Sequence, residues 1–214
     1  MAIETKPISC CFDQESERML KDFRKHGLSD TAGAIIDSVG REDLVGARLL
    51  ELGCGFGALT MEFVRRGAVS AVGIDLSPKM IQLGLALARE EGVAGSVSFE
   101  LGDGAVAKLP RSDIVVLDTV LCCYPDVSAL VANSSSAAMR YYAISIPDDS
   151  RLATRLLRLI LPLQRMLFRR SGFRFFVHPT AAICGQLEGI GFDLKSRSKV
   201  GWIWSVFLFS ARPG

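Results

Sequence analysis

The sequence lacks any uninterrupted hydrophobic run of the about 18–20 residues that a membrane-spanning helix requires. Its first residues are polar and of mixed charge, without the apolar core of a secretory signal. The composition, 49% hydrophobic and 22% charged over 214 residues, is ordinary for a soluble globular chain. We therefore expect a cytoplasmic protein, either a monomer or a homodimer.

The sequence also lacks the cysteine spacing of a disulfide framework or a zinc site. Four of its six cysteines form two adjacent pairs, Cys10–Cys11 and Cys122–Cys123, which suit neither an ordinary disulfide nor a C-x2-C motif. No second carboxylate lies at a useful spacing from Asp118. We interpret the cysteines as free thiols and expect no bound metal, with a metalloid at Cys122 and Cys123 as the less favoured alternative.

The middle of the chain alternates between strand-like and helix-like runs. Such alternation predicts βαβ units with right-handed crossovers, and hence a parallel sheet covered by helices on both faces. Ser77 and Pro78 have the residue types of a helix N-cap and first helical position. The strand-like runs are residues 47–52, 68–76, 96–103, 113–118 and 140–147.

The two ends of the chain depart from this alternation. Two strand-like runs follow residue 191, and the connection between them is so short that only an antiparallel hairpin fits. Before residue 46 lie two helical patterns, about 14–26 and 30–39, and no strand candidate. We expect residues 1–45 to form a helical cap and residues 46–214 to form a seven-stranded α/β domain.

The stretch ELGCGFG, residues 51–57, places three glycines at alternate positions directly after the first strand. A glycine-rich turn from a strand to a helix presents free N–H groups to a ligand. The G-x-G-x-G spacing differs from the dinucleotide fingerprint G-x-G-x-x-G/A, although Ala58 meets its relaxed form. The motif alone therefore leaves a dinucleotide open.

Carboxylates follow the next two strands. Asp75 ends the second strand and Asp103 lies between Gly102 and Gly104 after the third. The carboxyl ends of parallel strands meet at one edge of the sheet, where open α/β sheets bind ligands. There Asp75 is placed to accept hydrogen bonds from ribose hydroxyls, and Asp103 from an adenine amino group.

Together these residues resemble the class I S-adenosylmethionine-dependent methyltransferases. That family has an acidic residue before G-x-G-x-G, here Glu51, and an antiparallel last strand that NAD enzymes have no reason to share. The resemblance implies a Rossmann-like, doubly wound sheet and S-adenosyl-L-methionine as cofactor. It implies these cofactor-binding residues: Glu51, Gly53, Cys54, Gly55, Gly57, Asp75, Leu76, Met80, Gly102, Asp103, Gly104, Asp118 and Thr119.

Within that class, VLCCYPD (residues 120–126), FVHP (176–179) and a tryptophan-containing last strand are similar to bacterial small-molecule methyltransferases likened to magnesium-protoporphyrin O-methyltransferases. We expect methyl transfer to a small, apolar or aromatic acceptor, with O-methylation favoured. Two alternatives stay open: an NAD(P)-dependent oxidoreductase, and a domain that binds the cofactor without turnover.

Histidine is scarce, which narrows the choice of a general base. Only His26 and His178 occur, and an imidazole suits proton transfer near neutral pH. His178 is the leading catalytic candidate, although packing or capping of the following helix also explains it. Tyr124 is a second catalytic candidate that would hydrogen-bond the acceptor, and the turn YPD, which includes Asp126, explains it equally well.

The stretch 151–174 holds seven arginines and no acidic residue. Helical spacing puts Arg151, Arg155, Arg158, Arg165 and Arg169 on one face. The other side carries Leu152, Leu156, Leu159, Ile160, Leu163 and Leu167. We expect residues 151–178 to form a substrate lid whose leucines pack on the core and whose arginines are solvated. Pro162 should kink or divide the helix of this lid.

In the alternative, the helix 151–170 also makes weak contact with an anionic membrane surface. Nucleic acid is not expected as a partner, because no second basic or aromatic surface accompanies this helix.

Overall fold

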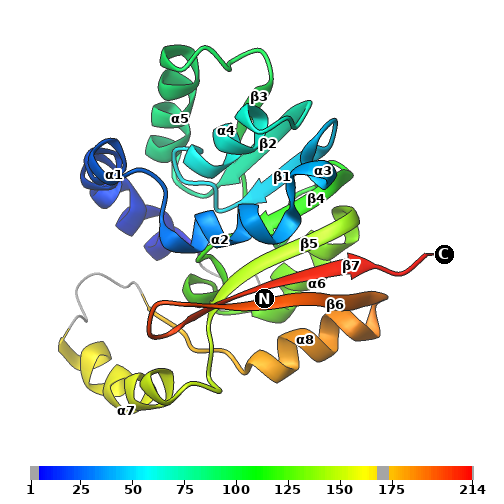
Figure 1. Cartoon of the computed structure of the whole chain (residues 1–214). Helices are drawn as coiled ribbons and strands as arrows, with labels where there is room; N and C mark the ends of the chain where they lie inside the picture. The colour runs from blue at the N-terminus through cyan, green and yellow to red at the C-terminus, as the bar shows by residue number, and fades with distance from the viewer. Residues whose placement is uncertain (1–4, 168–173, 214) are drawn as a thin grey trace.

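Seven strands form one mixed sheet in the order β3-β2-β1-β4-β5-β7-β6 (Figure 1). The computed structural model describes residues 5–167 and 174–213. Strands β1 to β5 pair in parallel, whereas β7 is antiparallel to both β5 and β6. The predicted sheet and terminal hairpin are thus confirmed. The strands are β1 (Arg48–Leu52), β2 (Ser70–Asp75), β3 (Val97–Leu101), β4 (Ser112–Leu117), β5 (Ala138–Pro147), β6 (Phe192–Val200) and β7 (Trp204–Ala211).

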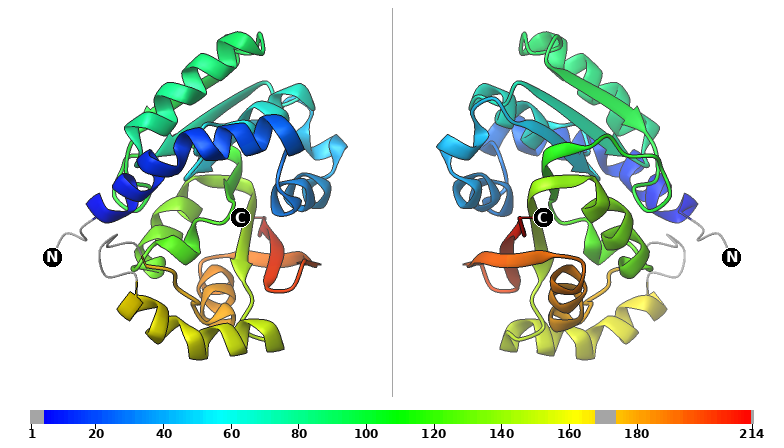
Figure 2. Two further views of the ribbon diagram at one scale, coloured as in Figure 1. Left: turned by 90° about the vertical axis from the view of Figure 1, so that its left-hand side faces the viewer. Right: turned by 90° about the vertical axis from the view of Figure 1, so that its right-hand side faces the viewer.

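Helices cover both faces of this sheet (Figure 2). One face packs against Leu130 of α6 and Leu187 of α8, the other against Ile35 of α2 and Phe63 of α4. The helices are α1 (Lys6–His26), α2 (Asp30–Val39), α3 (Arg41–Leu44), α4 (Ala58–Arg65), α5 (Pro78–Glu90), α6 (Val127–Ala137), α7 (Leu152–Leu167) and α8 (Thr180–Gly189), with a 3-10 turn η1 (Leu121–Cys123). Among the described residues no helix is long and apolar enough to cross a membrane.

The N-terminal cap is longer than its sequence pattern predicts. Helix α1 begins at Lys6 rather than near residue 14, because Pro7 is tolerated in a first helical turn. The Asp13 carboxylate of α1 accepts hydrogen bonds from Ser77 Oγ at 2.5 Å and from the Lys79 amide at 3.2 Å. Ser77 in turn caps α5 as predicted, accepting from the Met80 amide at 3.0 Å. These bonds fix α1 against the start of α5.

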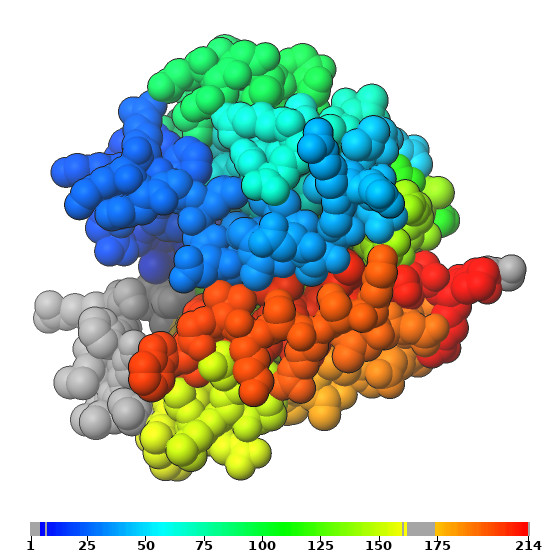
Figure 3. All heavy atoms as spheres, in the orientation of Figure 1, coloured from blue at the N-terminus to red at the C-terminus, as the bar shows by residue number. Residues whose placement is uncertain are grey.

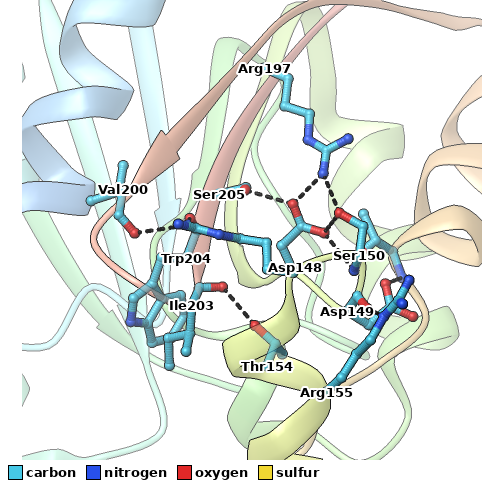
Figure 4. Close-up of polar contacts among 12 residues, drawn as sticks. Asp148, Asp149, Ser150, Thr154, Arg155, Arg197, Val200, Ile203, Trp204 and Ser205 are labelled. Atoms are coloured by element: carbon cyan, nitrogen blue, oxygen red, sulfur yellow. Dashed lines mark hydrogen bonds and ion pairs between the residues drawn. The ribbon is translucent and has the colours of Figure 1, made fainter.

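At the end of β5, a buried carboxylate joins the sheet to the hairpin (Figure 4). Asp148 accepts from Ser150 Oγ at 2.6 Å, from Ser205 Oγ at 2.7 Å and from Arg197. Burial opposes the ionised form, but these hydrogen bonds outweigh it and lower the pKa of Asp148 to about 2. The ionised carboxylate therefore holds β5, β6 and β7 together at this end.

Helix α7 follows directly and bears on two expectations, the division at Pro162 and the packing of its leucines. It runs without division through Pro162 to Leu167, and the predicted residues 168–170 lie outside the described chain. Leu152, Leu156 and Leu159 are 72%, 53% and 76% exposed, so the expectation that they pack on the core is wrong. The side chains of Ile160, Leu163, Arg165 and Leu167 and the residue Arg169 also lie outside the described part.

The orientation of α7 follows from its first turn. Arg151 is not a solvated arginine: its guanidinium donates to the carbonyls of Gly201 and Trp204, each at 2.6 Å, and to that of Val200 at 3.3 Å. Thr154 Oγ1 donates to the Ile203 carbonyl at 3.3 Å. These bonds turn the polar side of α7 toward the β6–β7 turn and leave the leucines outside.

Candidate functional site

The glycine turn after β1 needs bare backbone for two reasons. Gly53, Gly55 and Gly57 have φ angles of +65°, +55° and +76°, which disfavour any side chain. A Cβ on Gly53 would also lie 2.4 Å from Val120, and one on Gly57 would lie 2.1 Å from the Phe99 ring. The packing of the protein itself therefore requires Gly53 and Gly57, whereas a Cβ on Gly55 would meet only the Met80 sulfur at 3.9 Å.

Two adjoining cavities open beside this turn, and both are lined by Gly53, Gly55, Asp118 and Thr119. The first cavity, about 120 Å³, also includes these predicted residues: Asp75, Leu76, Met80, Gly102, Asp103 and Gly104. The second, about 610 Å³, adds Glu51 and Cys54. The structure thus brings the predicted cofactor residues to one place, except Gly57, which packs under Phe99.

The N-terminal helix forms a wall that sequence reasoning missed. Ile8, Phe12 and Met19 of α1 line the first cavity, and His26 and Ser29 line the second. In Figure 1, α1 lies on the side of the sheet at which β1 and β4 end. In the sequence, only the apolar positions of α1 indicated that this helix covers a surface. A helical pattern does not show which surface the helix covers.

The cavities are acidic. Their linings include these carboxylates: Asp22, Asp30, Glu51, Asp75, Asp103 and Asp118. Among the described lining residues there is no lysine or arginine, and His26 is the one imidazole. Burial raises the pKa of Glu51 to about 8, despite a hydrogen bond from Thr60, and burial likewise raises the pKa of Asp118. Buried carboxylates of this kind favour a cationic ligand.

Asp75 holds the glycine turn in place. Its carboxylate accepts from the Gly55 amide at 2.8 Å and from the Ser77 amide at 2.8 Å. Burial nevertheless raises the pKa of Asp75. The same side chain therefore shapes the turn and faces the first cavity.

Thr119 is a strained residue between the two cavities. Its φ of +58° is a conformation that costs a β-branched residue about 1–2 kcal/mol. The Thr119 amide donates to Ser145 Oγ at 2.7 Å, and that hydroxyl donates to Asp118 Oδ1 at 2.5 Å. Backbone strain of this kind concentrates at functional sites, where neighbouring contacts hold it.

Tyr124 lies beside Asp103 in the first cavity. Its hydroxyl donates to both carboxylate oxygens, at 2.9 Å and 3.0 Å. Burial and this bond raise the pKa of Tyr124, so the phenol keeps its proton. Asp126 caps α6 by accepting from the Ala129 amide at 3.0 Å. The predicted contact of Tyr124 with an acceptor stays a prediction, and its hydroxyl is engaged at Asp103.

His178 lies behind the η1 segment. Its Nε2 is 3.0 Å from the Tyr124 carbonyl, so Nε2 carries the proton and Nδ1 is the basic nitrogen. The ring stacks on Phe176 with centroids 5.4 Å apart, and burial lowers its pKa, which keeps it neutral near pH 7. His178 is not among the described residues that line either cavity, so its role as a base stays a prediction.

The two cysteines of η1 are free thiols. The Cys122 and Cys123 sulfurs are 3.6 Å apart. The hydrogen bond with Cys123 and burial raise the pKa of Cys122, so it stays a neutral thiol. In the described part of the chain no group of three or more potential ligands gathers in a way that would hold a metal ion.

Residues 49–140 match the family model described as a methyltransferase domain. The chain is 38% identical over 104 residues to the magnesium-protoporphyrin O-methyltransferase of Rhodobacter capsulatus, covering 48% of this chain and 46% of that one. It is 30% identical over 146 residues to the ribosomal protein L11 methyltransferase of Deinococcus radiodurans, covering 67% and 50%. The chain thus spans about half the length of the curated relatives it matches.

The fold is similar to that of the magnesium protoporphyrin IX methyltransferase from Synechocystis, solved with bound SAH. The TM-score is 0.75 at 21% identity, and the match covers 94% of this chain and 98% of that one. Residues 49–140 are thus similar to the methyltransferase domain family, and the strand order and overall fold agree with those of the Synechocystis methyltransferase.

Proposed function

We propose that this chain transfers the methyl group of S-adenosyl-L-methionine to an oxygen of a small, apolar or aromatic acceptor. The observation that carries the proposal is the acidic lining of the two cavities, in which the described residues include no lysine or arginine. A cofactor with an ammonium, a sulfonium and no phosphate complements this charge, whereas the diphosphate of NAD(P) is repelled. The oxidoreductase alternative is therefore not favoured.

The lining residues fit the parts of such a cofactor. Asp75 would accept hydrogen bonds from the ribose hydroxyls, and Asp103, oriented by Tyr124, would accept from the adenine amino group. Ile8, Phe12 and Met19 would cover the apolar side of the nucleoside.

Two carboxylates would hold the amino-acid end. Glu51 and Asp118 face the second cavity, and burial, together with the charge of Asp118, raises the pKa of Glu51. An ammonium group between them would favour their ionised forms.

The acceptor would enter beside the segment from Thr119 to Tyr124, where Cys123 lines the first cavity. The bound cofactor supplies an electrophilic methyl group, and the protein must hold the acceptor oxygen about 3–3.5 Å from it, in line with the breaking bond. A carboxylate acceptor needs no base. A hydroxyl acceptor would give its proton to His178 Nδ1. The similarity to an O-methyltransferase supports oxygen as the methylated atom.

Two measurements test this function in sequence. Calorimetry with S-adenosylhomocysteine and with NAD(H) decides the cofactor, and preferential NAD(H) binding would overturn the proposal. A methyl-transfer screen over phenols, carboxylates, quinols and porphyrins then decides the acceptor class. S-adenosylhomocysteine binding without transfer to any of them would favour the domain that binds the cofactor without turnover.

A further inference from the structure

Helix α7 presents an apolar face to solvent. Leu152, Leu156 and Leu159 follow one another at helical spacing and are all exposed. Thr154 and Leu161 on the opposite side are buried. The helix therefore packs on the protein through the side that faces away from its leucines.

An exposed tryptophan lies at the same end of the molecule. Trp202, 85% exposed, occupies the turn between β6 and β7. The carbonyls on either side of it, those of Gly201 and Ile203, accept from Arg151, directly before α7, and from Thr154 in its first turn. Figure 3 shows α7 and this turn, in yellow and orange-red, side by side. We call Leu152, Leu156, Leu159 and Trp202 the apolar end.

Exposed arginines accompany the leucines of the apolar end. Arg155, Arg158 and Arg174 are exposed, and residues 151–174 contain seven arginines without one acidic residue. Arg158 lies 3.9 Å from the Asp149 carboxylate. Exposed leucines with exposed arginines beside them on one helix, close to a tryptophan, are typical of helices that lie in the interface of an anionic membrane.

We propose that the apolar end binds the surface of a membrane that contains anionic lipids, with α7 lying in the headgroup layer. The leucines and Trp202 enter the boundary of the acyl chains, and the arginines contact lipid phosphates. This surface is separate from the cofactor cavities, and the inference does not depend on the proposed function.

The docked orientation has a chemical consequence. The segment that returns from α7 is fixed to η1, because the Phe176 amide donates to the Cys122 carbonyl at 2.7 Å. Cys123 of η1 lines the first cavity. Membrane docking therefore brings the edge of the cavity near the lipid, from which an apolar acceptor of low solubility can enter.

Flotation with lipid vesicles tests the inference on the full chain. Vesicles of phosphatidylcholine with phosphatidylglycerol are expected to carry the protein at low salt, and vesicles of phosphatidylcholine alone to carry little. Added salt should weaken binding, because the arginine contribution is screened. Trp202 emission should shift to the blue on binding, and Trp202→Phe should remove that shift while Trp204 remains.

A variant and its matched control locate the surface. The triple change Leu152→Ser, Leu156→Ser, Leu159→Ser is expected to lower vesicle binding by about 100-fold or more, as the loss of three inserted side chains predicts. The control Val45→Ser, Val69→Ser, Ile190→Ser replaces residues that are 65%, 59% and 51% exposed elsewhere, and should bind like the parent. Unchanged S-adenosylhomocysteine affinity and circular dichroism show that both variants fold.

Three results would overturn the inference. One is no flotation with anionic vesicles at low salt, and a second is equal flotation of the leucine variant and the parent. The third is self-association through the same leucines, seen by ultracentrifugation and lost in the leucine variant, in a protein that does not bind vesicles. That result would assign the apolar end to a second copy of this chain.

Discussion

The Gly55 amide donates to the Asp75 carboxylate at 2.8 Å, which joins the glycine turn after β1 to the end of β2. Because the Ser77 amide donates to the same carboxylate, Asp75 also fixes the start of α5. One side chain thus connects three elements around the first cavity, and its replacement should affect both binding and stability.

Asp75→Ala is expected to lower the affinity for S-adenosylhomocysteine by about ten-fold or more, and the free energy of unfolding by about 1–3 kcal/mol, as two backbone amides lose their acceptor. Asp75→Asn keeps one acceptor oxygen, so its affinity and its free energy of unfolding should fall less than those of Asp75→Ala. Calorimetry and urea unfolding measure the two effects, with exposed Asp37→Ala as control. Undiminished affinity in Asp75→Ala contradicts the ribose assignment.

Glu51 should make cofactor binding depend on pH. In the free protein its pKa is raised by burial to about 8, so it carries a proton at neutral pH and must release it to pair with an ammonium. Affinity for S-adenosylhomocysteine should therefore rise with pH, by at most about ten-fold per pH unit because one proton is released. It should level off above about pH 8.

Calorimetry in buffers of different ionisation enthalpy measures the released proton. Glu51→Gln should abolish both the proton release and the pH dependence of the affinity. The folded pKa lies above the ordinary value of 4.5, so the Glu51 contribution to the stability of the free protein is present below about 4.5 and lost as pH rises through about 8. A pH-independent affinity in the parent chain argues against the ammonium assignment.

Gly57→Ala and Gly27→Ala separate backbone strain from steric clash. The two glycines have similar φ angles, +76° and +78°, but a Cβ on Gly27 meets nothing within 4 Å. Both changes cost about 1–2 kcal/mol of strain. Gly57→Ala should cost about 1–3 kcal/mol more in urea unfolding, because its Cβ enters the Phe99 ring. Equal losses would show that Phe99 moves aside freely.

Asp148→Asn should lower stability at neutral pH by about 2 kcal/mol, the value of its pKa shift. The folded pKa of about 2 lies below the ordinary 3.8, so the contribution is present above 3.8 and lost as pH falls through about 2. The difference between variant and parent in urea unfolding should shrink over that range. Asp193→Asn, which removes an exposed ion pair with Arg212, serves as control and should change little. A constant difference across the acidic range contradicts the assignment.

His178→Gln tests the base. With a hydroxyl acceptor, kcat should fall about 100-fold or more. The parent should lose activity in acid with an apparent pKa below 6.5, because burial lowers the pKa of His178. The variant should not show this acid-side loss of activity. With a carboxylate acceptor neither change is expected. A variant with an unaltered pH profile and normal kcat on a phenol assigns His178 to support of the η1 segment instead.

The glycine turn, Asp75 and Asp103 were predictable from sequence because parallel strands bring their carboxyl ends to one edge, whatever the details of packing. The wall formed by Phe12 and Met19 was not, because an amphipathic pattern gives a helix an apolar face without naming what it covers. The bond from Tyr124 to Asp103 joins residues 21 positions apart across two loops, a distance over which local patterns carry no information.

The error at α7 has a definite physical cause. The pattern correctly separated leucines from arginines, and the inference that the leucines face inward followed the usual behaviour of surface helices. Arg151 reverses that preference, since three carbonyls of the β6–β7 turn need donors and its guanidinium supplies them.

The attachment of α7 also bears on how this protein can diversify. Both ends of the segment that contains α7 are held by hydrogen bonds. Arg151 and Thr154 bond to the β6–β7 turn at its start, and Phe176 bonds to η1 at its end. None of these anchors lines the cavities beside the glycine turn. We therefore predict that a chimaera carrying another insertion at the same two junctions keeps its affinity for S-adenosylhomocysteine while its binding to anionic vesicles changes.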